Sequence, residues 1–188
     1  MSAPPRNKVS ADQLKVRSLG AADSAVLASF SCGEPDLDDF LRSDALRLQG
    51  HRVVHTYLAF FDTTLVGYMS MLADAVVLET KERKRLSLSS HDHPGVPALK
   101  IARLGVAESF RATHSGAGAA LVQIALALAL DTAQRVGCRL LTVDAYPQSV
   151  AFYERLGFVS NRAKVYQGRQ HPSMRLDIFP SVPHAWVT

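Results

Sequence analysis

Two short segments in the second half of the chain have residue types suited to chemistry. In the first, Gly116, Ala117 and Gly118 stand directly before a long apolar stretch that predicts a helix. The first amides of a helix have no partners within it, and the helix dipole adds partial positive charge there. Glycine tolerates positive φ and lets a ligand approach the backbone closely. The segment therefore predicts a diphosphate site, although a Gly-x-Gly before a helix is also a common tight turn.

Side chains just upstream of these glycines can add hydrogen bonds to a phosphate: Arg111, Thr113, His114 and Ser115. The segment differs from two familiar nucleotide-binding signatures. No lysine follows the glycines, which excludes a P-loop, and Leu121 replaces the third glycine of the dinucleotide fingerprint. The sequence therefore predicts that backbone amides hold the anion, with help from these neighbouring donors.

The second segment, AFYERLGF at residues 151–158, places Tyr153 one turn before Gly157 on a short predicted helix. A tyrosine held near a cleft can donate a proton to a leaving group. The alternative is a core tyrosine packed beside Phe152. Both interpretations fit the pattern when this segment is considered alone.

Metal and disulfide chemistry are not expected. Cys32 and Cys138 are too few for a disulfide framework, and no His, Cys and Asp residues have the spacing of metal ligands. His91 and His93 lie in a polar stretch, where solvent exposure is the default. The first 13 residues have no apolar core of the kind a signal peptide needs, so we expect a cytoplasmic protein.

The elements that hold the two segments follow from the hydrophobic pattern. In the C-terminal half we expect strands at 98–106, 139–145, 158–166 and 173–179, and helices at 116–136 and 147–156. The apolar part of the first helix, residues 116–130, is shorter than the roughly 20 residues that a membrane span needs. We therefore expect it to be a buried core helix.

The N-terminal half predicts helices and a hairpin. We expect a strand at 14–19, helices after Asp23 and after Asp36, and a hairpin of residues 53–61 and 65–72. Residues 79–95 read as an exposed connection, helical at 81–86. The order of elements predicts an α/β mixed sheet. We expect a flexible tail at 1–12, one domain at 13–180 and a C-terminal tail at 181–188.

Composition limits the class of protein. Apolar residues make up 47% and charged residues 20%, which argues against wholesale disorder. The formal net charge of +4 favours anionic partners, although such a charge also simply keeps a protein soluble. The densest positive cluster is Lys81, Arg83, Lys84 and Arg85. It is either a contact for RNA or a solvated helix face.

Taken together, residues 98–160 resemble the GNAT superfamily of N-acetyltransferases. IARLGV at 101–106 is similar to its central strand, and ESFRATHSGAGAAL at 108–121 to its pyrophosphate loop. LLTVDAYPQSVAFYERLGF at 140–158 is similar to the next strand and helix. The resemblance implies a central, mostly antiparallel sheet with a splayed parallel strand pair, flanked by helices. It also implies acetyl-CoA as co-substrate and no metal.

The resemblance further implies direct acetyl transfer. A backbone N–H near Val106 would stabilise the oxyanion, Tyr153 would protonate the departing thiolate, and Asp144, Glu108 or a water would act as base. The residues that it assigns to the coenzyme are Leu104, Gly105, Val106, Arg111, Thr113, His114, Ser115, Gly116, Ala117, Gly118 and Ala119.

The chain departs from the family pattern in its loop. The family usually has Arg or Gln, two residues, Gly, one residue, then Gly or Ala. Thr113 stands at the basic position when the glycines are aligned, and aligning Arg111 instead leaves two extra residues in the loop. An Asn frequent after the next strand is also absent, with Tyr146 near that place.

The N-terminal stretch FSCGEPDLDDFLRSDAL at 30–46 resembles toxin-type GNAT proteins, which acetylate the α-amine of aminoacyl-tRNA. VPALKIARLGV at 96–106 is similar to the lead-in of the central strand in those proteins. Our main prediction is transfer from acetyl-CoA to a primary amine. The alternatives are toxin-type acetylation of aminoacyl-tRNA, with an antitoxin as partner, and a non-catalytic module that binds acyl-CoA. The sequence also allows a homodimer without deciding for it.

Overall fold

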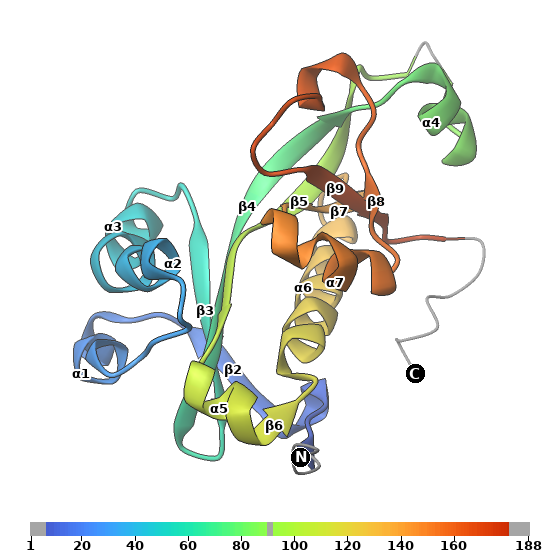
Figure 1. The fold of residues 1–188 in the computed structure, drawn as a ribbon. Helices are drawn as coiled ribbons and strands as arrows, with labels where there is room; N and C mark the ends of the chain where they lie inside the picture. The colour runs from blue at the N-terminus through green and yellow to red at the C-terminus, as the bar shows by residue number, and fades with distance from the viewer. Residues whose placement is uncertain (1–6, 90–91, 181–188) are drawn as a thin grey trace, which may run out of the picture. The chain divides into compact units, whose positions relative to one another are not determined.

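The computed structural model describes residues 7–89 and 92–180 (Figure 1). The chain forms two compact units: Met1–Leu72 with Ala102–Ile124, and Ala73–Ile101 with Ala125–Thr188. Strands β4 (Thr64–Val77) and β5 (Gly95–Val106) and helix α6 (Ala117–Ala133) run through both units. The predicted tail at 181–188 and His91 lie outside the described residues.

The first unit begins with a strand that the sequence did not predict. Its elements, besides its shares of β4, β5 and α6, are β1 (Asn7–Lys8), β2 (Leu14–Ser18), α1 (Ser24–Ala28), α2 (Pro35–Asp39), α3 (Ala45–Gly50), β3 (His55–Phe61), α5 (Glu108–Thr113) and β6 (His114–Ser115). Short 3-10 turns at Ala11–Gln13 and Ala21–Asp23 and a π-helical turn at Phe40–Asp44 complete it.

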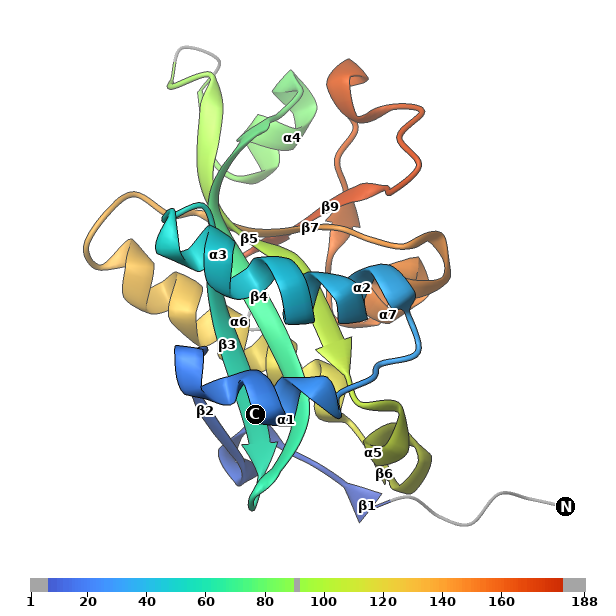
Figure 2. The ribbon, with the colours of Figure 1, turned by 90° about the vertical axis from the view of Figure 1, so that its left-hand side faces the viewer.

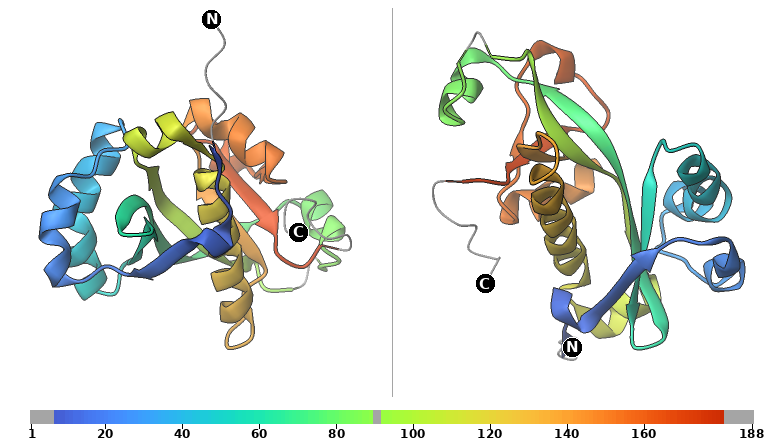
Figure 3. Two further views of the ribbon diagram at one scale, coloured as in Figure 1. Left: turned by 90° about the horizontal axis from the view of Figure 1, so that it is seen from below. Right: turned by 180° about the vertical axis from the view of Figure 1, so that it is seen from behind.

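The sheet of the first unit has the order β2-β3-β4-β5. Strand β3 pairs antiparallel with both β2 and β4, and the predicted hairpin is confirmed, turning at Asp62 with φ of 53°. Helices α1–α3 cover one side of these strands (Figure 2), and the first turns of α6 lie on the other side (Figure 3). In the helical segment after Asp36, the side chains of Leu37, Leu41 and Ala45 are buried.

The second unit holds the parallel strand pair. Its elements, besides its shares of β4, β5 and α6, are α4 (Thr80–Arg85), β7 (Leu140–Asp144), α7 (Val150–Arg155), β8 (Val159–Ser160) and β9 (Ser173–Asp177), with 3-10 turns at Pro147–Ser149 and Lys164–Tyr166. The strand order is β4-β5-β7-β9-β8. Strands β5 and β7 are parallel, and β7 and β9 are antiparallel. The predicted α/β mixed sheet with flanking helices is confirmed.

Several boundaries differ from the prediction. The strand expected at 158–166 is only β8, because beyond Ser160 the side chain of Asn161 bonds to Ser173 and the chain turns away. Of the flexible tail expected at 1–12, residues 7–12 include β1 and most of a 3-10 turn, and residues 1–6 lie outside the described residues. Helix α6 ends at Ala133, before the expected Val136. Among the described residues no helix is both long and apolar enough to cross a membrane.

Candidate active site

The predicted diphosphate segment is the entry to α6, in the first unit. The sequence predicted one loop after β5, but the chain forms α5 and then β6. Gly116 follows with φ of 88°, and the amide of Ala120 donates to the Gly116 carbonyl at 2.9 Å as the first helical bond. The amides of residues 117–119 therefore precede that bond and point out of the helix end. Gly118 lies inside the helix rather than in the loop.

The predicted donor side chains near Gly116 are largely engaged with protein. The Arg111 guanidinium donates to the Cys32 carbonyl at 2.6 Å. The Thr113 hydroxyl lies 2.8 Å from Nδ1 of His114, whose ring stacks on Phe110 with centroids 4.1 Å apart. Ser115 is half-buried in β6. What this end of α6 offers an anion is therefore mainly its backbone amides.

The last residues of β5 are shaped by close backbone packing. A Cβ on Gly105 would lie 2.7 Å from Cε1 of Tyr68, and one on Gly67 would lie 2.8 Å from the Gly105 carbonyl oxygen. Glycine is therefore required at both positions. The parallel register of β5 with β7 covers Ala98 to Ile101. Leu104, Gly105 and Val106 lie beyond that register.

A loop at residues 31–33 clamps the start of α5, and sequence reasoning missed this role. The Ser31 carbonyl accepts the Glu108 amide at 2.9 Å, next to the Cys32–Arg111 contact. Asp38 holds the loop: its carboxylate accepts the Cys32 amide and the Ser31 hydroxyl, both at 2.8 Å. The Cys-Gly…Leu-Asp pattern was the available signal, since it places Asp38 six residues after Cys32.

Ionisation states fit this structural role. Burial opposes the charge on Asp38, but the hydrogen bonds from Cys32 and Ser31 outweigh it and lower the pKa of that carboxyl. Burial raises the pKa of the Cys32 thiol to about 11. Cys32 is therefore a neutral, packed thiol at neutral pH and is poorly suited to act as a nucleophile.

Tyr153, the predicted proton donor, lies on α7 in the second unit. Its side chain is buried, with the rings of Phe152 and Phe158 centred 5.0 and 5.3 Å away. Burial raises the pKa of its phenol to about 12. The hydroxyl is therefore protonated across the physiological range and can donate a proton rather than accept one. The aromatic packing that the sequence offered as the alternative is present, and the donor role stays a prediction.

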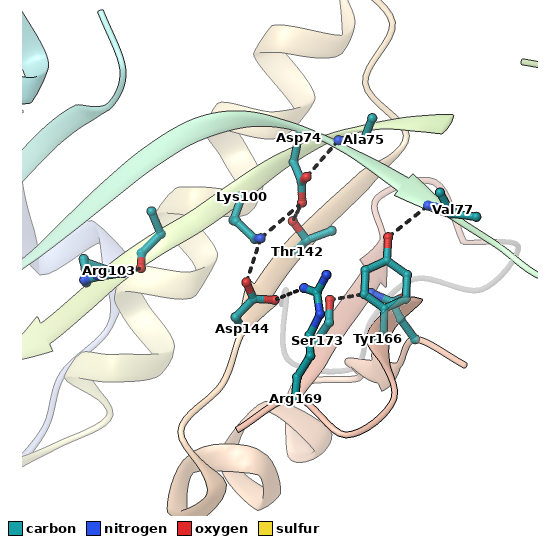
Figure 4. A network of polar contacts seen from close by, with 12 residues as sticks. Asp74, Ala75, Val77, Lys100, Arg103, Thr142, Asp144, Tyr166, Arg169 and Ser173 are labelled. Carbon is teal, nitrogen blue, oxygen red and sulfur yellow. Dashed lines mark hydrogen bonds and ion pairs between the residues drawn. The ribbon is translucent and has the colours of Figure 1, made fainter. Parts of the chain in front are cut away.

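Asp144, a predicted base, belongs to a chain of polar contacts in the second unit (Figure 4). Its Oδ2 lies 2.8 Å from the Lys100 ammonium, and Arg169 lies 4.0 Å from its other oxygen. Lys100 also lies 3.7 Å from Asp74, which accepts the Thr142 hydroxyl at 2.7 Å. The carboxylate of Asp144 is thus already paired with cations, which weakens it as a base. Glu108, the other side-chain candidate, is exposed at the first position of α5.

The positive cluster on α4 contains both exposed and buried side chains. Lys81, Lys84 and Arg85 are exposed as predicted, but Arg83 is only 6% exposed. Its guanidinium donates to three carbonyls within the 89–94 segment, at 2.9, 3.0 and 3.3 Å. The expectation of an exposed Arg83 is therefore wrong, because that side chain organises the following loop. Among the described residues no group of three or more His, Cys, Asp and Glu side chains has the arrangement of a metal site.

Comparison with known proteins identifies the family of the chain. The profile of the acetyltransferase (GNAT) family matches residues 23–158, a span that includes the entry to α6 and Tyr153. The chain belongs to the GNAT acetyltransferase family. This acetyltransferase is 29% identical over 138 residues to a tRNA-acetylating toxin of Mycobacterium tuberculosis, covering 73% of this chain and 80% of that protein.

Solved structures show the same fold. A Tyr-to-Phe mutant of KacT has a TM-score of 0.72 at 22% identity, covering 88% of this chain and 95% of that one. AtaT complexed with acetyl-methionyl-tRNAfMet has a TM-score of 0.70 at 21% identity, covering 87% and 94%. A Tyr-to-Phe mutant of AtaT bound to acetyl-CoA and the C-terminus of the antitoxin AtaR has a TM-score of 0.68 at 22% identity, covering 89% and 94%.

Proposed function

We propose that this acetyltransferase moves the acetyl group of acetyl-CoA to the α-amine of an aminoacyl-tRNA. The observation that carries the proposal is the similarity to the tRNA-acetylating toxin over 73% of this chain and 80% of that protein. The toxin-type pattern at residues 30–46 supports it, because Asp38 and the 31–33 loop give that pattern a structural role. The relatives thus favour the alternative that the sequence offered over its main prediction of a general primary amine.

The coenzyme is assigned to the first unit. The amides of residues 117–119 and the dipole of α6 receive the diphosphate. Residues 104–106, beyond the β5–β7 register, pair with the pantetheine arm, and an N–H near Val106 stabilises the oxyanion. The complex of AtaT with acetyl-CoA supports this choice of co-substrate.

Tyr153 is assigned the role of general acid. The amine nitrogen attacks the thioester carbon, the C–S bond breaks, and the sulfur takes the phenol proton. The nitrogen gives up one of its own protons to water, and the phenolate of Tyr153 then regains a proton from solvent. A phenol whose pKa is raised to about 12 carries its proton at working pH, as this step needs. Retention of this tyrosine argues against the non-catalytic alternative.

The RNA is assigned to the exposed cations of α4, namely Lys81, Lys84 and Arg85. Each contact with a phosphate releases counterions, so binding should weaken as salt rises. Arg83 is excluded from this surface because its guanidinium is buried. An antitoxin partner is part of the proposal, supported by the complex of AtaT with AtaR.

Transfer of labelled acetyl from acetyl-CoA tests the function directly. Charged tRNAs, the same tRNAs after deacylation, a polyamine and an N-terminal peptide would serve as acceptors in parallel. We expect label only in charged tRNA, recovered as N-acetyl-amino acid after mild alkaline hydrolysis. Label in the polyamine or peptide but not in charged tRNA would overturn the choice of acceptor. Binding of acetyl-CoA without transfer to any acceptor would favour the non-catalytic module.

A further inference from the structure

The N-terminal strand lies along the segment that enters α6. Strand β1 pairs parallel with β6, with Asn7 opposite His114 and Lys8 opposite Ser115. The ladder continues for one more bond, from the Val9 amide to the Ser115 carbonyl at 2.8 Å. Both strands belong to the first unit, and Figure 2 shows them side by side. Residues 7–9 are therefore paired with the segment that the resemblance assigns to the coenzyme.

Gly116 lies against this strand. A Cβ at this position would lie 2.6 Å from the Val9 carbonyl oxygen and 3.6 Å from Cγ of Lys8. Its glycine is thus explained by the approach of β1 together with its positive φ, rather than by a ligand. Side chains alternate along a strand, so buried Val9 and exposed Lys8 face opposite ways. The Lys8 side chain therefore starts beside the first turn of α6 and is free to extend into solvent.

In the loop that the resemblance assigns to the coenzyme, residues 108–119, the one cationic side chain is held by a protein carbonyl. With the glycines aligned, Thr113 stands where the family pattern has Arg or Gln, and its hydroxyl contacts His114. The Arg111 guanidinium donates to the Cys32 carbonyl. A diphosphate bound by amides alone keeps most of its charge, and a nearby ammonium on a flexible stem offsets it. Lys8 is placed by β1 to do so.

We propose that Lys8 supplies the cation for the coenzyme diphosphate, in place of the basic residue that the family pattern has at the position of Thr113. The inference rests on the proposed use of acetyl-CoA. It makes β1 a part of the coenzyme site and Lys8 a binding residue. Its side chain pairs with the diphosphate, while Val9 and the β1–β6 ladder hold the loop that presents the amides.

The test compares Lys8→Met with a matched control, Lys15→Met, which removes another exposed lysine of the first unit. Calorimetric titration with acetyl-CoA at low salt should show about 3- to 10-fold weaker binding for Lys8→Met. The variant should also lose part of the salt dependence. Lys15→Met should bind as wild type does, and Lys8→Arg should restore the affinity.

A comparison of acetyl donors tests which group of the coenzyme pairs with Lys8. With acetyl-(3′-dephospho)-CoA, which keeps the diphosphate, wild type should still bind more tightly than Lys8→Met by the same ratio. With acetyl-pantetheine, which lacks the diphosphate, the two affinities should be equal, a ratio of one. A ratio that falls to one already with the dephospho compound would overturn the diphosphate assignment. Equal binding of acetyl-CoA by wild type and Lys8→Met would overturn the role of Lys8. Absence of binding by wild type would overturn the proposed function itself.

Discussion

Replacing Asp38 by alanine should loosen the loop that clamps α5. Asp38 is 5% exposed, and its carboxylate accepts two hydrogen bonds of 2.8 Å, from the Cys32 amide and the Ser31 hydroxyl. Bonds to a charged acceptor contribute about 1.5–3 kcal/mol each, and their losses at one site do not add fully. We therefore expect Asp38→Ala to lower the free energy of unfolding by about 2–4 kcal/mol. Asp38→Asn, which keeps one acceptor oxygen, should cost less.

The assay is urea denaturation at neutral pH together with a thermal melt. A loss of this size in a chain of 188 residues corresponds to a melting temperature lower by about 5–15 °C. Asp39→Ala is the matched control. The side chain of Asp39 is 75% exposed, and its 3.3 Å ion pair with Arg42 lies at the surface, where such pairs contribute little to stability. That control should stay within about 0.5 kcal/mol of wild type. Equal midpoints for Asp38→Ala and Asp39→Ala would refute the assigned role of the buried carboxylate.

The same residue makes stability depend on pH. The pKa of Asp38 is lowered in the folded protein, so its contribution is present above the ordinary aspartate pKa, roughly 3.9. That contribution is lost as the pH falls through the lowered folded value. The stability difference between wild type and Asp38→Ala should therefore shrink in acid, and a difference that grows there would contradict the sign of this shift.

The remaining predictions concern catalysis, RNA binding and the structural role of Arg83. Tyr153→Phe should lower kcat about 100-fold or more and leave the Kd of acetyl-CoA unchanged; unchanged turnover would remove the phenol from the mechanism. Because the pKa of Tyr153 is raised to about 12, its phenol should cause no fall in rate between pH 8 and 10. A fall in that range that Tyr153→Phe abolishes would contradict the assignment. Lys84→Glu with Arg85→Glu should weaken tRNA binding several-fold and reduce its salt slope without changing the melting temperature, as measured by filter binding and calorimetry. Arg83→Gln should instead lower stability by about 2 kcal/mol or more, because three carbonyls lose their donor; an unchanged melt would contradict its structural role.

Local patterns predicted the framework well. The hairpin of β3 and β4, the strand β5 and the helix α6 follow from hydrophobic periodicity and from turn residues near in sequence. The positive φ of Gly157 after α7 has the same origin, because a helix end commonly needs a glycine there. Such features depend on residues within a few positions of one another.

Contacts between distant residues were not predictable in this way. Arg83 was assigned to the surface because charged residues usually lie there, yet carbonyls up to Pro94 bury it. Lys8 was placed in a flexible tail because its partner, Ser115, comes much later in the chain. Asp38 belongs to a helix that was predicted from its sequence pattern, and only the folded 31–33 loop shows what its carboxylate binds. In each case the missing information is a contact partner.

The pairing of β1 with β6 also has a consequence during synthesis. Lys8 leaves the ribosome early, whereas its partner Ser115 is added only after more than half of the chain has been made. Closing so large a segment costs conformational entropy, so this ladder is expected to form late. A nascent polypeptide that has not yet reached Ser115 therefore has no β1–β6 ladder to order the segment before α6.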